Sequence, residues 1–367
     1  MVDVTTDLIN TTAQDRPFSE GGSVVTATLL LMMMIFGIMG NLVTIIVIAA
    51  SKSLKSVFNL LIISLCVSDL LSAIVSPLAL YRRTWGFEEW LLPKEFCNLF
   101  MATDIWTSGV TTLHILLFCI IRFISMRWPF NYKNIRKIHV KALVISIWVV
   151  ALCCGGIPGW FAYKAGKRPP NSKWPACTLD PDWLSQYRIY SKIVFPVFIL
   201  LPMIAIFILS IAIILLLIKR RTTRSEKKIP PMPEAASKQM ENIRRKLQKK
   251  ENKAILQLSL IGGSFMFGYI PIICYNFYTT TVDTTTIDEK ERIVDWNFGM
   301  ISYILLRLSE CLNPVFYNIA SGKMRKETVS LLRKLSKCQC LRKKESNGNM
   351  IQYQTRDSSS KTGTLQI

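Results

Sequence analysis

Apolar residues in this chain gather into long runs separated by short charged stretches. A helix needs roughly 20 predominantly apolar residues to cross the hydrocarbon core of a bilayer, and several of the runs approach or exceed that length. The pattern therefore predicts an all-α membrane protein built as a seven-transmembrane helix bundle. The predicted spans are residues 24–50, 57–81, 97–121, 140–161, 189–218, 254–279 and 293–320.

Composition and charge predict how the bundle is oriented in the membrane. Half of the 367 residues are hydrophobic (50%) and the net charge is +21, with a mean hydropathy of +0.31. If residues 1–23 are extracellular, 32 of the 45 lysines and arginines fall in inner segments, which is the positive-inside pattern. The basic excess thus indicates a multi-pass plasma-membrane protein with affinity for membrane lipids, and we expect no nucleic-acid partner.

The outer segments offer two kinds of covalent modification. Asn10 opens an Asn-Thr-Thr glycosylation sequon on the predicted outer side. Of ten cysteines, only Cys97 and Cys177 fall in outer regions. A single disulfide between them is the economical interpretation in an oxidising exterior, and two free thiols are the alternative.

The predicted cytoplasmic end carries an anchor and a tail. Residues 321–336 place apolar side chains between basic ones, which is typical of an amphipathic helix lying on the inner leaflet. Cys338 and Cys340 follow it among lysines and arginines and suit palmitoylation. Residues 337–367 read as a disordered tail that ends in Leu-Gln-Ile, so Ile367 is a candidate ligand for a PDZ domain.

Ionisable side chains inside the spans are few, and each is a functional hypothesis because burying it in a bilayer costs several kcal/mol. They are Asp69, Asp104, Lys192, Arg307 and Glu310. Lys192 lies near an outer end, where it can extend to the membrane surface. We expect the others to face the interior of the bundle.

Short motifs at consistent spacing make the chain resemble a rhodopsin-like (class A) G-protein-coupled receptor over roughly residues 35–335. A second-span acid, a third-span arginine 25 residues after Cys97, and prolines in the fourth to seventh spans all stand at the family's positions. The matching residues are Gly40-Asn41-Leu42-Val43, Asp69, Trp90, Arg122, Pro129, Trp148, Pro158, Pro202, Pro271 and Asn313-Pro314-Val315-Phe316-Tyr317.

The resemblance implies a two-state receptor that activates a heterotrimeric G protein and recruits arrestin once its tail is phosphorylated. It further implies a polar switch in which Asn313 joins Asp69, with Tyr317 below. In this family a sodium ion often binds near that aspartate, and Thr111 stands where its serine ligand usually lies. We expect no other cofactor and no metal cluster.

One departure from the family pattern concerns activation. The triplet around Arg122 reads Ile121-Arg122-Phe123, so the neighbouring acid is missing. Glu251 lies 20 residues before Pro271, at a position whose acid can hold that arginine. We therefore predict an Arg122–Glu251 latch at the cytoplasmic end, the alternative being a solvated glutamate among lysines.

The residues of the expected ligand pocket also depart from the family pattern. Asp104 stands where amine receptors bind an ammonium group, but Arg307 is expected to face it, and Tyr269 replaces the family's sixth-span tryptophan. We expect Asp104 and Arg307 to pair, because burying one charge alone costs far more than burying both in contact. Glu310 either shares Arg307 or sits against Asp69. Tyr269 and Tyr303 complete the candidate ligand-binding residues.

These residues favour a receptor for a peptide or a small polar ligand. Three versions of the Asp104–Arg307 pair stay open: a purely structural lock, a site for a ligand with acid or amide groups, and direct amine binding to Asp104. A transporter or channel would need inverted repeats or broken helices, which the sequence does not display. An enzyme would need a nucleophile–base pair, and none is evident, with His114 and His139 the sole histidines.

Overall fold

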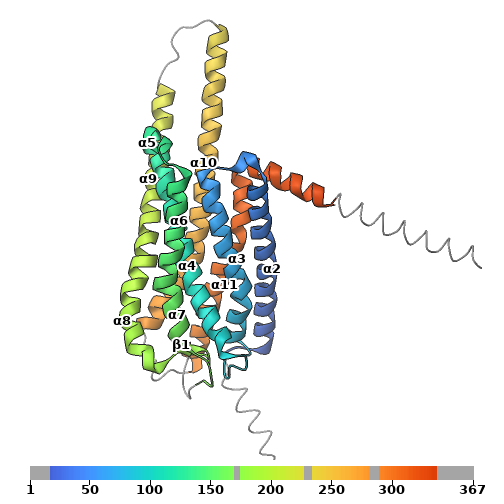
Figure 1. Ribbon diagram of the computed structural model, residues 1–367, viewed down its shortest axis with the longest axis vertical. Helices are drawn as coiled ribbons and strands as arrows, with labels where there is room; N and C mark the ends of the chain where they lie inside the picture. The colour runs from blue at the N-terminus through green and yellow to red at the C-terminus, as the bar shows by residue number, and fades with distance from the viewer. Residues whose placement is uncertain (1–16, 169–173, 227–233, 282–288, 337–367) are drawn as a thin grey trace, which may run out of the picture.

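The computed structural model is an elongated bundle of helices that run roughly parallel or antiparallel to one another (Figure 1). It describes residues 17–168, 174–226, 234–281 and 289–336. Six stretches of these residues are long and apolar enough to cross a membrane. The remaining predicted span lies in helix α11 (Glu289–Ala320), which packs along α10 (Glu234–Thr281) and also touches α2 and α3.

The helices are longer than the apolar spans, because backbone hydrogen bonding continues past the point where side chains become polar. The first span lies in a helix that begins at Glu20, where the hydroxyl of Ser19 caps it by accepting from the backbone N–H of Gly22 at 3.1 Å. The elements of the first half are α2 (Glu20–Ala50), η1 (Lys52–Leu54), α3 (Val57–Arg83), α4 (Lys94–Arg127) and α5 (Pro129–Lys133).

The helices of the fourth and fifth spans each contain one turn of π-helix near a proline. The fourth comprises α6 (Lys137–Ala151), η2 (Leu152–Gly156) and α7 (Ile157–Phe161). The fifth comprises α8 (Leu184–Phe195), η4 (Pro196–Leu200) and α9 (Leu201–Glu226), after the short turn η3 (Pro181–Trp183).

Pro158 explains one contact between these two rods. Proline has no N–H to donate to the carbonyl four residues earlier, which here belongs to Cys154. The hydroxyl of Tyr190 on α8 donates to that carbonyl instead. The missing helical hydrogen bond is thus replaced by one between the helix of the fourth span and the helix of the fifth span.

A small hairpin covers the outer end of the bundle. Strands β1 (Tyr163–Lys164) and β2 (Thr178–Leu179) pair antiparallel, with Tyr163 opposite Leu179. The expected disulfide is confirmed: Cys97 at the start of α4 bonds to Cys177 beside β2, with the Cα atoms 5.9 Å apart. The bond holds the hairpin over the third span.

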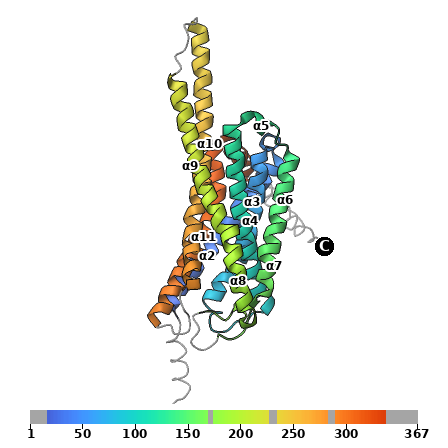
Figure 2. The same cartoon turned by 90° about the vertical axis from the view of Figure 1, so that its left-hand side faces the viewer.

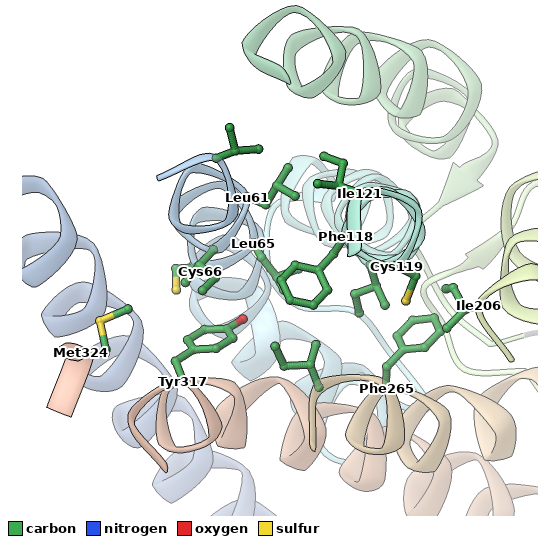
Figure 3. Packing of buried hydrophobic residues seen from close by; sticks show 14 of the residues in the cluster. Leu61, Leu65, Cys66, Phe118, Cys119, Ile121, Ile206, Phe265, Tyr317 and Met324 are labelled. Carbon is green, nitrogen blue, oxygen red and sulfur yellow. The ribbon is translucent and has the colours of Figure 1, made fainter. Parts of the chain in front are cut away.

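The largest hydrophobic core fills the cytoplasmic half of the bundle (Figure 3). Leu65 of α3, Phe118 of α4, Ile206 of α9 and Tyr317 of α11 all belong to it and are at most 5% exposed. The outward faces remain apolar, as lipid requires; Phe207, for example, is 59% exposed. Within the membrane, charged side chains therefore have only the bundle interior in which to meet.

Residues 322–336 form a further helix that leaves the bundle after α11 (Figure 1). Met324 is 1% exposed and belongs to the core, whereas Leu332 and Leu335 are about half exposed. The hydroxyl of Ser53 on the first inner loop donates to Glu327 at 3.2 Å. That this helix lies on the inner leaflet stays a prediction.

Candidate ligand and switch site

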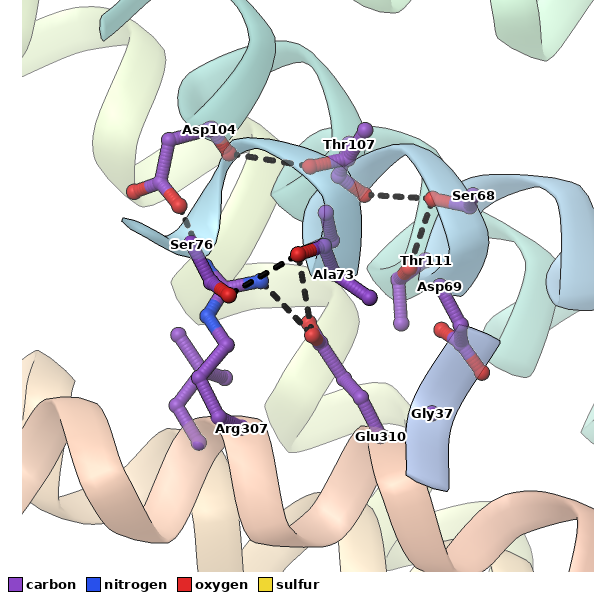
Figure 4. A network of polar contacts seen from close by, with 12 residues as sticks. Gly37, Ser68, Asp69, Ala73, Ser76, Asp104, Thr107, Thr111, Arg307 and Glu310 are labelled. Carbon is purple, nitrogen blue, oxygen red and sulfur yellow. Dashed lines mark hydrogen bonds and ion pairs between the residues drawn. The ribbon is translucent and has the colours of Figure 1, made fainter. Parts of the chain in front are cut away.

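A buried polar network joins α4, α11 and α3 in the outer half of the bundle (Figure 4). Arg307 of α11 lies at its centre and donates from Nη2 to Asp104 of α4. Its Nη1 donates to Oε2 of Glu310 at 2.7 Å, and the hydroxyl of Ser72 on α3 donates to the same oxygen at 2.9 Å. The predicted Asp104–Arg307 pair is confirmed, and of the two alternatives for Glu310 the shared arginine is the one observed.

The surroundings of Arg307 explain why it tolerates burial. Arg307 is 2% exposed and Glu310 5% exposed, so both charges are removed from water. Two carboxylates and the face of the Tyr303 ring, whose centroid is 4.6 Å from the guanidinium carbon, stabilise the cation. The side chain of Asp104 is 25% exposed, so this is the member of the network that an entering ligand can reach.

Asp69 and Asn313 form the next layer towards the cytoplasm. The amide of Asn313 donates to Oδ2 of Asp69 at 2.9 Å, as predicted. Oδ1 of Asp69 and Oδ1 of Asn41 are buried without a hydrogen-bond partner among the described residues. Both residues line a cavity of about 10 Å³, shared with Glu310 and Arg307, which is room for one water molecule or small ion.

Thr111 lies beside Ser68, the residue before Asp69. Its hydroxyl is 3.0 Å from that of Ser68, and Ser68 donates to the carbonyl of Thr107 at 3.1 Å (Figure 4). Thr111 is therefore the donor to Ser68, its oxygen lone pairs stay available, and its expected role as a sodium ligand stays a prediction. Which hydroxyls meet depends on the rotation of α3 against α4, and spacing along one helix does not report that rotation.

The two candidate tyrosines differ in their access to a ligand. Tyr303 is half-buried and stacks against Arg307. Tyr269 is 2% exposed, with its ring centroid 4.3 Å from that of Phe265. Tyr269 is therefore accessible to a ligand only after neighbouring side chains move, and its role in ligand binding stays a prediction.

A second ion-pair cluster, at the outer ends of the helices, was missed by the sequence interpretation. Arg83, the last residue of α3, donates to the hydroxyl of Tyr275 on α10 at 2.7 Å and lies 3.9 Å from Asp295 on α11. Its carbonyl accepts from the indole of Trp296 at 2.7 Å. An arginine and an aspartate at the ends of apolar runs were the available signal, but nothing in their spacing indicated that they meet.

A third network, around His114, joins α3, α4 and α6. Its Nε2 is 2.8 Å from the hydroxyl of Ser64, and Nδ1 is 2.8 Å from the carbonyl of Val110. The indole of Trp148 donates to the same Ser64 hydroxyl at 2.8 Å. The histidine thus connects three helices and lies outside the ligand and switch networks.

At the cytoplasmic end, Arg122 rests on an aromatic surface. Its guanidinium carbon lies 5.1 Å from the ring centroid of Phe58 on α3, and Phe58 in turn stacks on Tyr132 at 6.2 Å. The side chain of the predicted partner Glu251 falls outside the described residues, so the latch stays a prediction. Tyr317 is fully buried in the core beside this region.

Several predicted modification and partner sites also lie outside the described residues. They are Asn10, Cys338, Cys340 and Ile367. The roles assigned to these residues stay predictions.

Comparison with known proteins agrees with this architecture. The family description "7 transmembrane receptor (rhodopsin family)" matches residues 40–317, which is most of the chain. The α-1A adrenergic receptor of Rattus norvegicus is 23% identical over 383 residues, covering 94% of this chain and 74% of the relative. The growth hormone secretagogue receptor type 1 of Sus scrofa is 25% identical over 317 residues, covering 84% and 80%.

The chain belongs to the rhodopsin family of seven-transmembrane receptors, the class A G-protein-coupled receptors. It is a multi-pass plasma-membrane receptor that signals between an extracellular ligand and a G protein, and its family is one of receptors and not of enzymes. The relatives include receptors named for an adrenergic and for a secretagogue response. Membership alone therefore leaves both amine and peptide ligands open.

Proposed function

We propose that this receptor responds to a peptide or a small polar ligand whose acid or amide groups insert into the Asp104–Arg307 pair. The observation that carries the proposal is the pair itself, a buried cation bound to a carboxylate that is still 25% exposed. An acid of the ligand competes with Asp104 for Arg307, and an amide N–H of the ligand compensates Asp104. After the exchange Arg307 still faces an anion and Asp104 still accepts a hydrogen bond, so neither group is buried without a polar partner.

The pair also offers a route from ligand to switch. Arg307, Glu310 and Asn313 follow one another at three-residue spacing on α11, and each bonds to a different neighbour on α4 or α3. Weakening the contact with α4 allows α11 to shift against α3, which changes the Asn313–Asp69 contact and the packing of Tyr317. The ligand moves this equilibrium only by its differential affinity for the two states.

We further propose a sodium ion near Asp69 in the inactive state. The unpaired oxygens of Asp69 and Asn41 are hard donors that suit a small cation, and they share a cavity of matching size. Thr111 remains a proposed ligand, since it donates its hydrogen to Ser68 and keeps its oxygen lone pairs for the ion. With Asp69, Glu310 and Asp104 against a single Arg307, the surroundings retain excess negative charge when all are ionised.

On the cytoplasmic side, the basic inner loops and the inner end of α10 are the proposed docking surface for the G protein. Phosphorylation of Ser358–Ser360 is proposed to recruit arrestin, and Ile367 to bind a PDZ domain. The supporting observations are the loop charges and the tail sequence alone.

A charge swap tests the pair. Asp104→Arg and Arg307→Asp are each expected to reduce surface expression strongly, because each leaves like charges buried together. The double variant is expected to recover expression. Surface immunostaining measures the expression of the single and double variants, and a double variant no better than the singles contradicts the pairing.

A signalling screen of peptide and amine libraries on wild type and Arg307→Ala then tests the ligand class.

A monoamine ligand is the second candidate function. It is favoured by the partial exposure of Asp104 and the likeness to adrenergic receptors. Arg307 opposes it, because the guanidinium competes for the carboxylate and repels an ammonium ion. Under this alternative, amines activate the wild type and Arg307→Ala increases their potency.

A further inference from the structure

We infer that Arg82, at the outer end of α3, is a carboxylate-binding subsite for the ligand of this receptor. The side chain is only 9% exposed, so its charge is largely removed from water. Its Nε donates to the backbone carbonyl of Cys177 at 2.6 Å, which orients the guanidinium beside the disulfide. The inference deepens the proposed function, because it assigns one chemical group of the ligand to one residue.

The contrast with neighbouring arginines carries the argument. In the outer half of the described structure, three other arginines with side chains at most 13% exposed each lie against a carboxylate. Arg83 faces Asp295, Arg168 faces Glu88 at 2.8 Å, and Arg307 faces Asp104. Arg82 instead donates its hydrogen bond to a neutral carbonyl. A buried cation with no carboxylate in direct contact is costly, and the ligand can supply that contact.

The free atoms of Arg82 match a carboxylate. Nη1 and Nη2 make no hydrogen bond to any described residue, and neither is among the fully buried polar atoms. A guanidinium edge with two such nitrogens binds both oxygens of a carboxylate in parallel. The subsite therefore has a positive charge, two donors spaced for a carboxylate, and access for a ligand.

The surroundings of Arg82 place it at the entrance to the ligand site. Its neighbours include the cation Arg83, Tyr163 of β1 and Tyr275 of α10, and Asp104 of α4 acts on its charge without forming an ion pair with it in the described structure. A ligand whose carboxylate binds Arg82 can thus present an amide N–H to the exposed side of Asp104. The C-terminal residue of a peptide carries these two groups next to each other.

A binding experiment on the purified full-length receptor tests the inference without any signalling readout. N-acetylglycine serves as a probe with a carboxylate next to an amide N–H, and N-acetylglycinamide is its neutral match. At equal ionic strength, N-acetylglycine is expected to raise the Tm of the wild type by several degrees, and the amide to leave it unchanged. Inorganic phosphate is run in parallel; stabilisation by phosphate alone contradicts the carboxylate assignment.

Variants localise the effect. Arg82→Gln can still donate to the Cys177 carbonyl but lacks the charge. We expect this substitution to lower the affinity of the receptor for N-acetylglycine at least tenfold. Arg82→Lys keeps the charge, and its affinity for N-acetylglycine is expected to lie between those of the wild type and Arg82→Gln. Lys164→Gln, which removes an exposed cation of β1, is the control and should respond as wild type does.

Two results overturn the inference: no stabilisation of the wild type, or an equal Tm shift in Arg82→Gln. If Arg82→Gln does not fold, an Arg82→Lys variant that responds as fully as the wild type also overturns it. Because no G protein takes part in this assay, its failure leaves the proposed receptor function untouched.

Discussion

At the scale of single residues, the cytoplasmic arginine shows how an altered motif is compensated. Ile121 replaces the acid that normally neighbours Arg122 in this family, and Arg122 instead lies over the ring of Phe58. A cation over an aromatic face gains about 0.5–2 kcal/mol, depending on how far it is desolvated. The aromatic contact connects α4 to α3 and holds Arg122 in the described conformation.

We predict that Phe58→Leu raises basal signalling several-fold, because it removes the aromatic face and keeps an apolar side chain. Phe58→Tyr should behave as the wild type. Basal G-protein activation in membranes, normalised to surface expression, measures the effect. Phe130→Leu is the control, since Phe130 is 79% exposed and pairs only with Lys133 at 5.7 Å among the described cations. Unchanged basal activity in Phe58→Leu would show that the ring does not restrain Arg122.

At the scale of elements, small residues determine how closely the helices approach. A Cβ atom added to Gly268 of α10 would lie 2.3 Å from the hydroxyl oxygen of Ser309 and 2.7 Å from its Cβ. A Cβ added to Gly40 of α2 would meet the ring of Pro314 at 3.1 Å. Helix α11, which carries Arg307, Glu310 and Asn313, is therefore held by close contacts on two sides.

We predict that Gly268→Ala destabilises the receptor by about 1–3 kcal/mol, the usual range for overpacking a core. Adding Ser309→Gly should restore most of the loss, because it removes the clashing side chain. Thermal unfolding of the purified receptor measures both. Gly263→Ala is the matched control on the same helix: nothing lies within 4 Å of the added Cβ, so its Tm should stay level or rise. Equal losses at Gly268 and Gly263 would contradict the close approach.

At the scale of the whole molecule, the polar residues form layers along the bundle. Arg83 and Asp295 lie at the outer ends, Asp104 and Arg307 below them, and Asp69 and Asn313 lower again. Each layer links α11 to α3 or α4. A movement of α11 therefore alters all three layers together, which is how a local ligand contact can shift a global equilibrium.

The proposed sodium site leads to a prediction at this scale. Replacing N-methyl-D-glucamine chloride by sodium chloride at constant ionic strength should lower basal G-protein activation several-fold, within the usual 1–3 kcal/mol of allosteric coupling. Asp69→Asn should abolish the sodium response. Thr111→Val should weaken it, because the substitution removes the hydroxyl oxygen beside Ser68 that is proposed to reach the ion. A sodium response that survives Asp69→Asn would exclude this site.

The sequence predicted those parts of the site that family spacing defines. The Cys97–Cys177 disulfide, the Asp104–Arg307 pair and the Asp69–Asn313 hydrogen bond are all present. Each partner that lies in a span is at a depth given by its spacing from a motif residue or from Cys97. Depth is a property of one helix at a time, so the order of residues along the chain is enough to predict it.

Contacts that depend on helix ends or helix rotation were missed. The Arg83–Tyr275–Asp295 cluster forms where three helices end, and these helices extend beyond the apolar spans. The Thr111 hydroxyl turned out to meet Ser68. A few degrees of rotation or one further helical turn decides such contacts, and hydropathy does not resolve either.

The sequence by itself determined that apolar segments cross a membrane, that lysine-rich ends face the cytoplasm, and which few charges lie between. The physical reason is that a bilayer penalises each exposed polar group separately, so the penalty can be read segment by segment. Only the tertiary structure decided that Arg307 binds Glu310 as well as Asp104, that Arg122 rests on Phe58, and that Arg82 lies against a neutral carbonyl. Those choices depend on packing between helices, where the energy of a charge is set by neighbours distant in the chain.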